Sequence, residues 1–236
     1  MGERRIAIMQ PYFFPYIGYW QLMAMADLFV VYDDGLFRKK GWIHRNRILG
    51  YGPPKLIGTQ VLDMSCNRKI NETVRIYDPI YVAKTLRGLE YRYRRAPHYA
   101  EVMEVIRPHI DNRETNLVRY LLGGLEAVRT YLGIETPLVL SSTVDKAGAD
   151  GAVAKAGRIC EKFGIRNYVN PIGGAELYTR EEFARYGMDL SFIRRNDDIA
   201  YVQFEDAFVP DLSIIDVMMF NSVPEIRDLL KRYTLV

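Results

Sequence analysis

The chain has 236 residues, of which 49% are hydrophobic and 26% are charged, and its formal net charge is +3. This is ordinary globular composition, and the near-neutral charge favours neither nucleic acid nor a membrane surface as a partner. The two cysteines are isolated, the three histidines are scattered, and no apolar run reaches roughly 18 residues. These features argue against disulfides, a zinc site and membrane insertion, so we expect a cytoplasmic protein and assign no metal site.

The predicted elements begin with a strand, a helix and a second strand. Residues 6–9 and 28–32 are apolar throughout, which is typical of parallel strands covered on both faces, and residues 17–26 read as a buried helix between them. Strand, helix and strand within about 30 residues make a βαβ unit. Residues 56–62 predict another strand after a Gly- and Pro-rich turn.

The middle of the chain, at about 79–133, predicts helices. Its clearest helix carries one apolar stripe, at spacings of three and four, formed by Leu117, Leu121, Leu125, Val128 and Leu132. Asp111 and Glu114 predict a capping box at the start of this helix, and Gly133 predicts its end.

After Pro137 strands and helices alternate again. Strands are predicted at 138–141, 167–170 and 190–193, and helices at 153–163, 179–187 and 213–220. This alternation predicts a single α/β domain over residues 1–236, with a mainly parallel, Rossmann-like sheet and flanking helices.

Polar residues follow four of the predicted strands at the points where the strands end. They are Gln10, the pair Asp33-Asp34, Asn170, and the run Arg194-Arg195-Asn196. Ligands of open parallel sheets bind beyond the carboxyl ends of the strands, so we expect a site along this edge. In particular, we expect one cleft to be lined by Gln10, Asp33, Asp34, Arg45, Asn46 and Asn170.

Aromatic residues fill the segment after the first strand. Tyr12, Tyr16 and Tyr19 are candidate ligand-binding residues, because each combines an apolar ring with a hydroxyl that needs a partner. Gly18 stands in the first turn of the next helix, where a missing side chain would let a ligand approach unpaired N–H groups. The alternative is that these rings only pack.

The second strand is followed by an acidic pair and then by a basic segment. Asp33 and Asp34 suit either Mg²⁺ or sugar hydroxyls, and otherwise form a strand-end turn. In the basic segment, Lys40, Trp42, Arg45 and Asn46 suit an anion clamp or a solvated loop. Near Asn170, Gly173 and Gly174 permit close backbone approach to a ligand. No nucleophile with a neighbouring base is evident in the sequence, so the catalytic residues, the cofactor and the oligomeric state stay open.

Six stretches together resemble the WbqC-like proteins of bacteria: MQPYFFPYIGYWQL, YDD, KKGWIHRNRI, YVNPIGGAELY, LSFI and FVPDLSIIDVMMFNS. The chain departs from the family at His44, where Asn is usual, and in residues 143–158, where a more polar helix start is usual. Members occur in O-antigen and other surface-polysaccharide gene clusters. The resemblance implies a transferase for a nucleotide-activated amino sugar or an acyl or aminoacyl donor, with a small-molecule ligand and no nucleic acid.

A fainter resemblance is to the start of the nucleotidylyltransferase superfamily. Tyr16-Ile17-Gly18-Tyr19 stands where that superfamily has His-x-Gly-His. Tyrosine donates a hydrogen bond but carries no positive charge at neutral pH, so the resemblance implies the fold more than adenylyl transfer. Two alternatives to the transferase stay open: a nucleotidylyltransferase-like enzyme, and a non-catalytic binding protein of a polysaccharide pathway.

Overall fold

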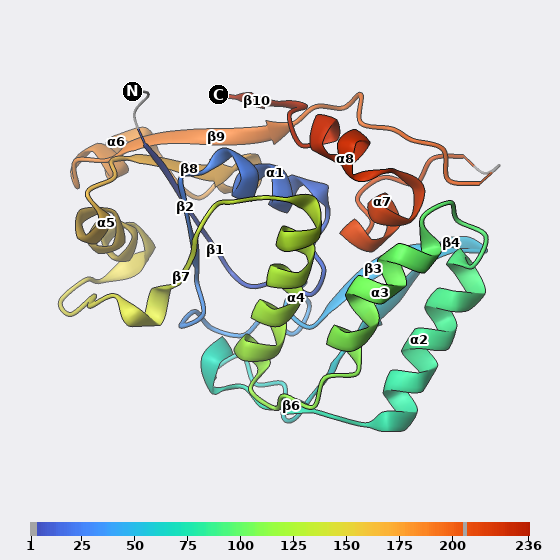
Figure 1. Ribbon diagram of the computed structural model, residues 1–236. Helices are drawn as coiled ribbons and strands as arrows, with labels where there is room; N and C mark the ends of the chain where they lie inside the picture. The colour runs from blue at the N-terminus through green and yellow to red at the C-terminus, as the bar shows by residue number, and fades with distance from the viewer. Residues whose placement is uncertain (1–3, 205–206) are drawn as a thin grey trace.

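A computed structural model describes residues 4–204 and 207–236 (Figure 1). Its main sheet has the strand order β10-β9-β8-β1-β2-β7, and every neighbouring pair is parallel except β9 with β10. The strands are β1 (Arg5–Met9), β2 (Leu28–Val31), β7 (Leu138–Leu140), β8 (Asn167–Pro171), β9 (Asp189–Arg195) and β10 (Tyr233–Leu235). The predicted α/β class with a mainly parallel sheet is confirmed, as is the first βαβ unit.

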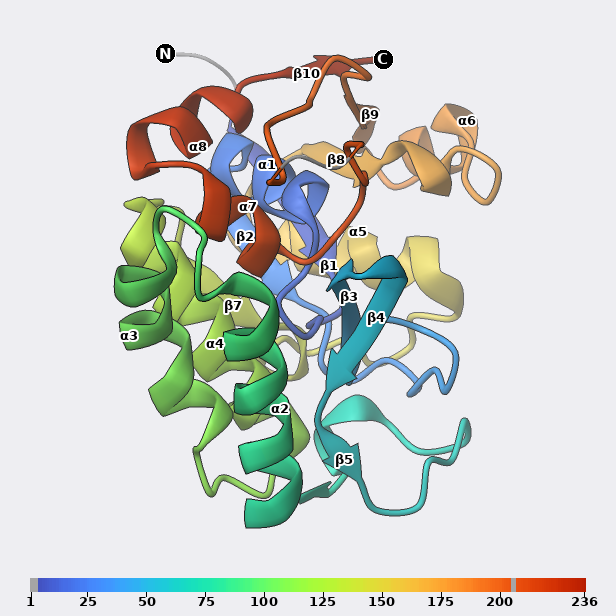
Figure 2. The same ribbon diagram turned by 90° about the vertical axis from the view of Figure 1, so that its right-hand side faces the viewer.

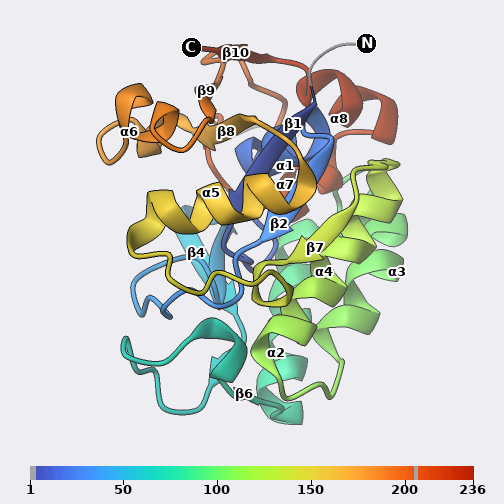
Figure 3. The ribbon, with the colours of Figure 1, turned by 90° about the vertical axis from the view of Figure 1, so that its left-hand side faces the viewer.

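Both faces of the sheet are covered by helices. Along β2, Phe29 belongs to the core formed with α1 (Ile17–Met25), whereas its neighbour Leu28 belongs to the core formed with α5 (Gly151–Phe163). Figure 3 shows α5 crossing the sheet on the face opposite α1. Because successive side chains of a strand point to opposite faces, burial on both faces explains the continuous apolar runs.

Three antiparallel helices form the predicted helical segment: α2 (Pro79–Tyr93), α3 (Tyr99–Ile110) and α4 (Leu117–Leu132). They pack side by side in Figure 1, and their apolar faces join the core of the α1 face. The chain therefore inserts this helical layer between β2 and β7, which are neighbours in the sheet.

The predicted start of α4 is wrong, because Asp111 and Glu114 lie before the helix, which begins at Leu117. Asp111 is the C-cap of α3, and Glu114 accepts a hydrogen bond from the backbone N–H of Asn116. Asn116 is the N-cap of α4, and its side chain accepts from the N–H of Arg119 at 3.1 Å. Gly133 ends α4 in the left-handed conformation, with φ of 66°, as predicted.

A two-stranded hairpin lies outside the main sheet (Figure 2). It consists of β3 (Arg45–Gly50) and β4 (Gly52–Gly58), so the basic segment ends in a strand and not only in a loop. The strand predicted at 56–62 is divided between β4 and β5 (Gln60–Val61), which pairs with β6 (Arg75–Ile76). The division falls at Thr59, whose N–H bonds to the carbonyl of His44.

The remaining helices are short. They are the 3-10 turns η1 (Ile70–Glu72), η2 (Ser141–Thr143) and η3 (Ile172–Gly174), and the helices α6 (Arg180–Ala184), α7 (Ile214–Phe220) and α8 (Val223–Leu229). The predicted capping of α6 by Thr179 is confirmed, whereas α8 and the antiparallel edge strand β10 were not predicted. None of the helices in the described residues is long and apolar enough to cross a membrane.

Candidate functional site

The order in which the chain adds strands to the sheet reverses between β1 and β8. From β1 the chain passes through α1 to the neighbouring strand β2, and β2 pairs with β7. From β7 it passes through α5, on the other face, to β8 on the opposite side of β1. Ligands of open α/β sheets bind at such a reversal, beyond the carboxyl ends of the strands. The space beyond Met9 of β1 and Pro171 of β8 is therefore the expected location of a site.

Two cavities lie beyond these strand ends and share a wall. The α1-side cavity, of about 610 Å³, is lined by Tyr16 and Gly18 at the start of α1 and by residues of β3 and β9. The α5-side cavity, of about 440 Å³, is lined by α5 and by residues that follow β1, β2 and β8. Met9, Tyr12, Pro171 and Gly173 line both. Both volumes fall in the range of roughly 300–1,000 Å³ that small-molecule sites occupy.

Nine of the fourteen predicted ligand-binding residues line these cavities: Gln10, Tyr12, Tyr16, Gly18, Trp42, Asn46, Asn170, Gly173 and Gly174. The other five, Tyr19, Asp33, Asp34, Lys40 and Arg45, line neither cavity. The polar residues expected in a single cleft are thus divided between two cavities. Asp33, Asp34 and Arg45 line neither of them. Ligand binding by any of these residues stays a prediction.

The α1-side cavity has charged and aromatic walls. The guanidinium of Arg47 lies 5.5 Å from the ring centre of Trp42, and its Nη2 donates to the carbonyl of Asp211. Arg195 pairs with Asp211 at 3.5 Å, and Arg194 also lines the cavity. Such a set can bind a polar ligand with both anionic and ring-shaped parts.

Asn46 makes three hydrogen bonds within the protein. Its Nδ2 donates to the carbonyls of Phe13 (3.1 Å) and Phe14 (2.8 Å), and its Oδ1 accepts from the N–H of Arg47. Ser213 also donates to the carbonyl of Phe14, at 2.7 Å. These bonds hold Phe14 at a φ of 41°, which is unfavourable for a residue with a side chain. Asn46 therefore fixes the loop that carries Tyr12, and both of its N–H donors are used in these contacts.

The space beside Gly18 is filled by a side chain of the protein. A Cβ atom on Gly18 would lie 2.5 Å from the ring of Tyr16 and 2.8 Å from its hydroxyl. The missing side chain thus makes room for Tyr16, and not directly for a ligand as expected. The Tyr16 hydroxyl makes no hydrogen bond to another described residue. Burial, followed by Asp211, raises the pKa of Tyr16 against the opposing effect of Arg195, so the hydroxyl is a neutral donor.

Tyr19 belongs to the core. Its ring is buried against Phe29, and its hydroxyl donates to the carbonyl of Gln10 at 3.1 Å. Lys40 is exposed, and Arg45 donates from Nε to the carbonyl of Gly41 at 3.4 Å. These three residues support neighbouring segments of the chain or face solvent.

The two aspartates connect the ends of β2 and β7. Asp33 accepts from the N–H of Ser142 at 2.9 Å, and Asp34 accepts from the Ser141 hydroxyl at 2.7 Å. Lys146 lies 3.0 Å from the Asp34 carboxylate. Burial opposes ionisation of Asp34, but the hydrogen bonds from Ser141 and Lys146 and the charge of Lys146 outweigh it and lower the pKa. Both aspartates are thus held by contacts within the protein, in a turn at the end of β2.

The α5-side cavity contains the loop predicted near Asn170. Nδ2 of Asn170 donates to the Tyr168 hydroxyl at 2.8 Å. A Cβ on Gly174 would lie 2.6 Å from Oδ1 of Asn170, so only glycine leaves this amide in place. Five other lining residues with polar side chains were not predicted: Tyr32, Arg38, Lys155, Tyr168 and Tyr178. Tyr32 directly precedes the acidic pair and Arg38 directly precedes Lys39-Lys40 of the basic segment, so their positions could have indicated them, whereas no pattern marks Lys155.

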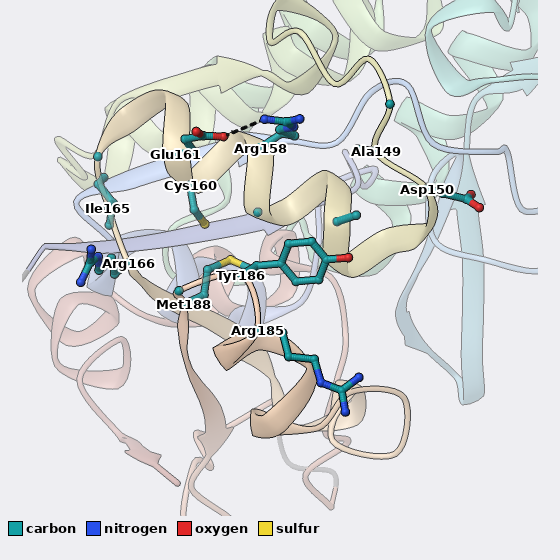
Figure 4. A pocket seen from close by; sticks show the side chains of 15 residues that line it. Ala149, Asp150, Arg158, Cys160, Glu161, Ile165, Arg166, Arg185, Tyr186 and Met188 are labelled. Carbon is teal, nitrogen blue, oxygen red and sulfur yellow. Dashed lines mark hydrogen bonds and ion pairs between the residues drawn. The ribbon is translucent and has the colours of Figure 1, made fainter.

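A third hollow, of about 910 Å³, lies between α5 and α6 (Figure 4). Tyr186 packs against α5 here, where a Cβ on Gly157 would lie 3.3 Å from it, and Arg158 pairs with Glu161 at 3.1 Å. Arg166 and Met188 directly precede β8 and β9, so this hollow lies at the amino ends of the strands. It is larger than the other two, but the geometry of parallel sheets favours the opposite edge.

The sequence places the protein among known families. The profile of the WbqC-like protein family matches residues 10–228. The chain belongs to this family. The WbqC-like protein is 29% identical over 230 residues to an uncharacterized protein of Mycobacterium tuberculosis, Rv1507c, and the alignment covers 97% of this chain and 98% of that one. No solved structure matches the WbqC-like protein.

Proposed function

We propose that this WbqC-like protein is a transferase that holds one ligand in each of the two cavities and moves a small group across their shared wall. The observation that carries the proposal is the shared wall itself, formed by Tyr12 and Gly173 with Met9 and Pro171. Group transfer needs two substrates whose reacting atoms approach within about 3–3.5 Å, and adjoining cavities at the sheet reversal suit that need.

For the donor, we propose a nucleotide-activated amino sugar or an acyl or aminoacyl compound of surface-polysaccharide synthesis. The family resemblance supports this proposal. The neutral hydroxyls of Tyr12 and Tyr16 and the arginines near Trp42 suit a ligand with hydroxyl groups, a ring and negative charge.

The geometry favours this proposal over adenylyl transfer. In the nucleotidylyltransferase-like alternative, Tyr16 and Tyr19 would replace two phosphate-binding histidines. Tyr19 is 1% exposed and lines neither cavity, and its hydroxyl donates a hydrogen bond to the carbonyl of Gln10. The non-catalytic alternative expects scattered polar residues, whereas Gln10, Tyr12, Tyr16 and Asn170 all line the two adjoining cavities.

Gly173→Leu tests the proposal. A Cβ at Gly173 would meet nothing within 4 Å, so the leucine can be accommodated and would project into the shared space. After a thermal-shift screen with nucleotides, nucleotide sugars and acyl carriers has identified a donor and an acceptor, we expect the wild type to bind both together. Gly173→Leu should keep the melting midpoint and lose transfer between the two.

Gly88→Leu is the matched control, because a Cβ added at Gly88 in α2 would also meet nothing within 4 Å, and no residue of α2 lines either cavity. It should transfer at the wild-type rate. Competition of the two ligands for one cavity, or unchanged transfer in Gly173→Leu, would contradict the proposal.

A further inference from the structure

The α5-side cavity carries unpaired positive charge. Arg38 and Lys155 line it, and neither side chain makes an ion pair or hydrogen bond with another described residue. Within the described part of the chain, no Asp or Glu lines this cavity, whereas Asp197 and Asp211 line the α1-side cavity. The α5-side cavity is therefore the one of the two that favours an anion on charge alone.

The neighbouring acidic pair does not cancel this charge. Asp34 is near enough to contribute, after burial, to the raised pKa of Tyr32, which lines the cavity. Its carboxylate, however, is held by Lys146 at 3.0 Å and by the hydroxyl of Ser141. Arg38 and Lys155 are thus left without a counter-ion among the residues that the structure describes.

A buried amide in the same cavity lacks one partner. Asn170 is 8% exposed, and its Nδ2 donates to the Tyr168 hydroxyl, but no described residue donates to its Oδ1. This oxygen is not fully buried, so it can accept a hydrogen bond from a hydroxyl or amino group of a ligand in the cavity. The ligand that fits is consequently an anion that also carries such a donor.

The start of α5 adds to the preference for an anion. Ala152 in its first turn lines the cavity, and the N-cap residue Asp150 makes no side-chain hydrogen bond to the first-turn N–H groups. Unpaired N–H groups at a helix start attract negative charge. Two cations and this helix start together suit the double negative charge of a phosphate monoester.

We propose that the α5-side cavity binds the phosphate group of a hydroxylated ligand, such as a phosphorylated sugar, with Arg38 and Lys155 on the phosphate and Asn170 on a hydroxyl. The inference rests on the proposed function, since it assigns a second, phosphorylated substrate to the cavity that adjoins the one suited to the donor. Tyr12 and Gly173 then place the other end of that substrate at the wall shared with the second cavity.

Calorimetric titration tests this assignment with inorganic phosphate, glucose 1-phosphate, glucose and glucuronate at constant ionic strength. We expect glucose 1-phosphate to bind more tightly than phosphate, and both to bind more tightly than glucose or glucuronate. Arg38→Gln and Lys155→Gln should each weaken binding of the two phosphates about tenfold or more, as expected for a lost charge-assisted hydrogen bond.

Lys162→Gln is the control, because Lys162 is an exposed cation on the same helix outside this cavity. Loss of phosphate binding no greater in Lys155→Gln than in Lys162→Gln would overturn the assignment, as would glucuronate binding as tightly as glucose 1-phosphate. These results do not bear on the outcome of the Gly173→Leu test. The phosphate assignment can therefore be overturned while the two-ligand transferase is retained, and the transferase can be overturned while phosphate binding is retained.

Discussion

Single side chains decide which polar groups of this protein remain available to a ligand. Asn46, Asp33 and Asp34 all follow or lie near strand ends, yet each is used up by contacts within the chain. By contrast, Asn170 near the end of β8 and Tyr16 at the start of α1 keep a polar atom without a partner among the described residues. The difference lies in which neighbours reach them, and that is a property of the folded chain.

Asn46→Asp should destabilise the protein strongly. The substitution replaces an amide donor with a carboxylate oxygen that faces the carbonyls of Phe13 and Phe14, so two buried hydrogen bonds become repulsive contacts. We expect a loss of at least about 2 kcal/mol in the free energy of unfolding, measured by urea denaturation. Asn112→Asp is the control, because Asn112 uses its Oδ1 to accept from the N–H of Glu114. Equal midpoints for the two variants would contradict the role of Asn46.

Asp34→Asn should cost stability at neutral pH and much less in acid. Because the pKa of Asp34 is lowered in the folded state, its contribution is complete above the unfolded pKa of about 4 and disappears as the pH falls below it. We expect a loss of about 1.5–3 kcal/mol at pH near 7, measured by urea denaturation across the pH range. Asp198→Asn, at an exposed position, should show little change. A loss that does not vary with pH would rule out the ion pair with Lys146 as its source.

Between elements, a buried carboxylate ties α7 to its neighbours. Asp216 is 0% exposed and accepts from Tyr93 of α2 at 2.6 Å on Oδ2, and from Tyr201 at 2.7 Å and Gln203 at 2.6 Å on Oδ1. The Tyr93 hydroxyl also accepts from the N–H of Leu49 in β3. One side chain thus connects α7, α2, the hairpin and the loop before α7.

Tyr93→Phe should be more destabilising than Tyr201→Phe. Loss of the Tyr201 hydroxyl leaves Gln203 on the same oxygen, at a cost of about 1.5–3 kcal/mol. Loss of the Tyr93 hydroxyl leaves Oδ2 of Asp216 and the N–H of Leu49 unpaired together, so it should cost more. Burial raises the folded pKa of Asp216, so its proton favours folding at low pH and both losses should shrink in acid. Calorimetric melting of the two variants at several pH values checks the order.

The elements that the sequence predicts correctly are those whose pattern reflects burial. The apolar runs of β1 and β2 and the stripe of α4 follow directly from the cores they enter. The strand β3 was missed, although Asn46 and Ile48 are buried and alternate with Arg45 and Arg47, because its cations favoured a loop. The edge strand β10 has no such pattern, since pairing with β9 and not burial defines it.

At the scale of the whole molecule, the first helix is joined to the last turn of the chain. Gln21 of α1 is fully buried, and its Nε2 donates to the carbonyls of Leu229 and Arg232 at 2.9 Å each. Residues from the two ends of the sequence therefore fix one another beside the α1-side cavity, which Gln21 also lines.

Gln21→Leu should loosen this connection. It leaves two carbonyls without a donor and should lower the free energy of unfolding by about 1–3 kcal/mol. Relative to the wild type, Gln21→Leu should accelerate hydrogen exchange in β10, which follows Arg232, more than in α3. Gln60→Leu is the control, because the side chain of Gln60 makes no hydrogen bond to another described residue. Equal exchange of β10 in both variants would contradict the connection.

The insertion of α2, α3 and α4 between two adjacent strands also affects the order of folding. β2 and β7 pair in parallel, but the whole segment 32–137 separates them, so their pairing closes a very long loop. Such contacts form slowly, because the loss of chain entropy comes before the contact is made. The three helices, whose contacts are local, should therefore form first and bring the ends of the segment together. In pulse-labelling during refolding, amides of α4 should gain protection before those of β7.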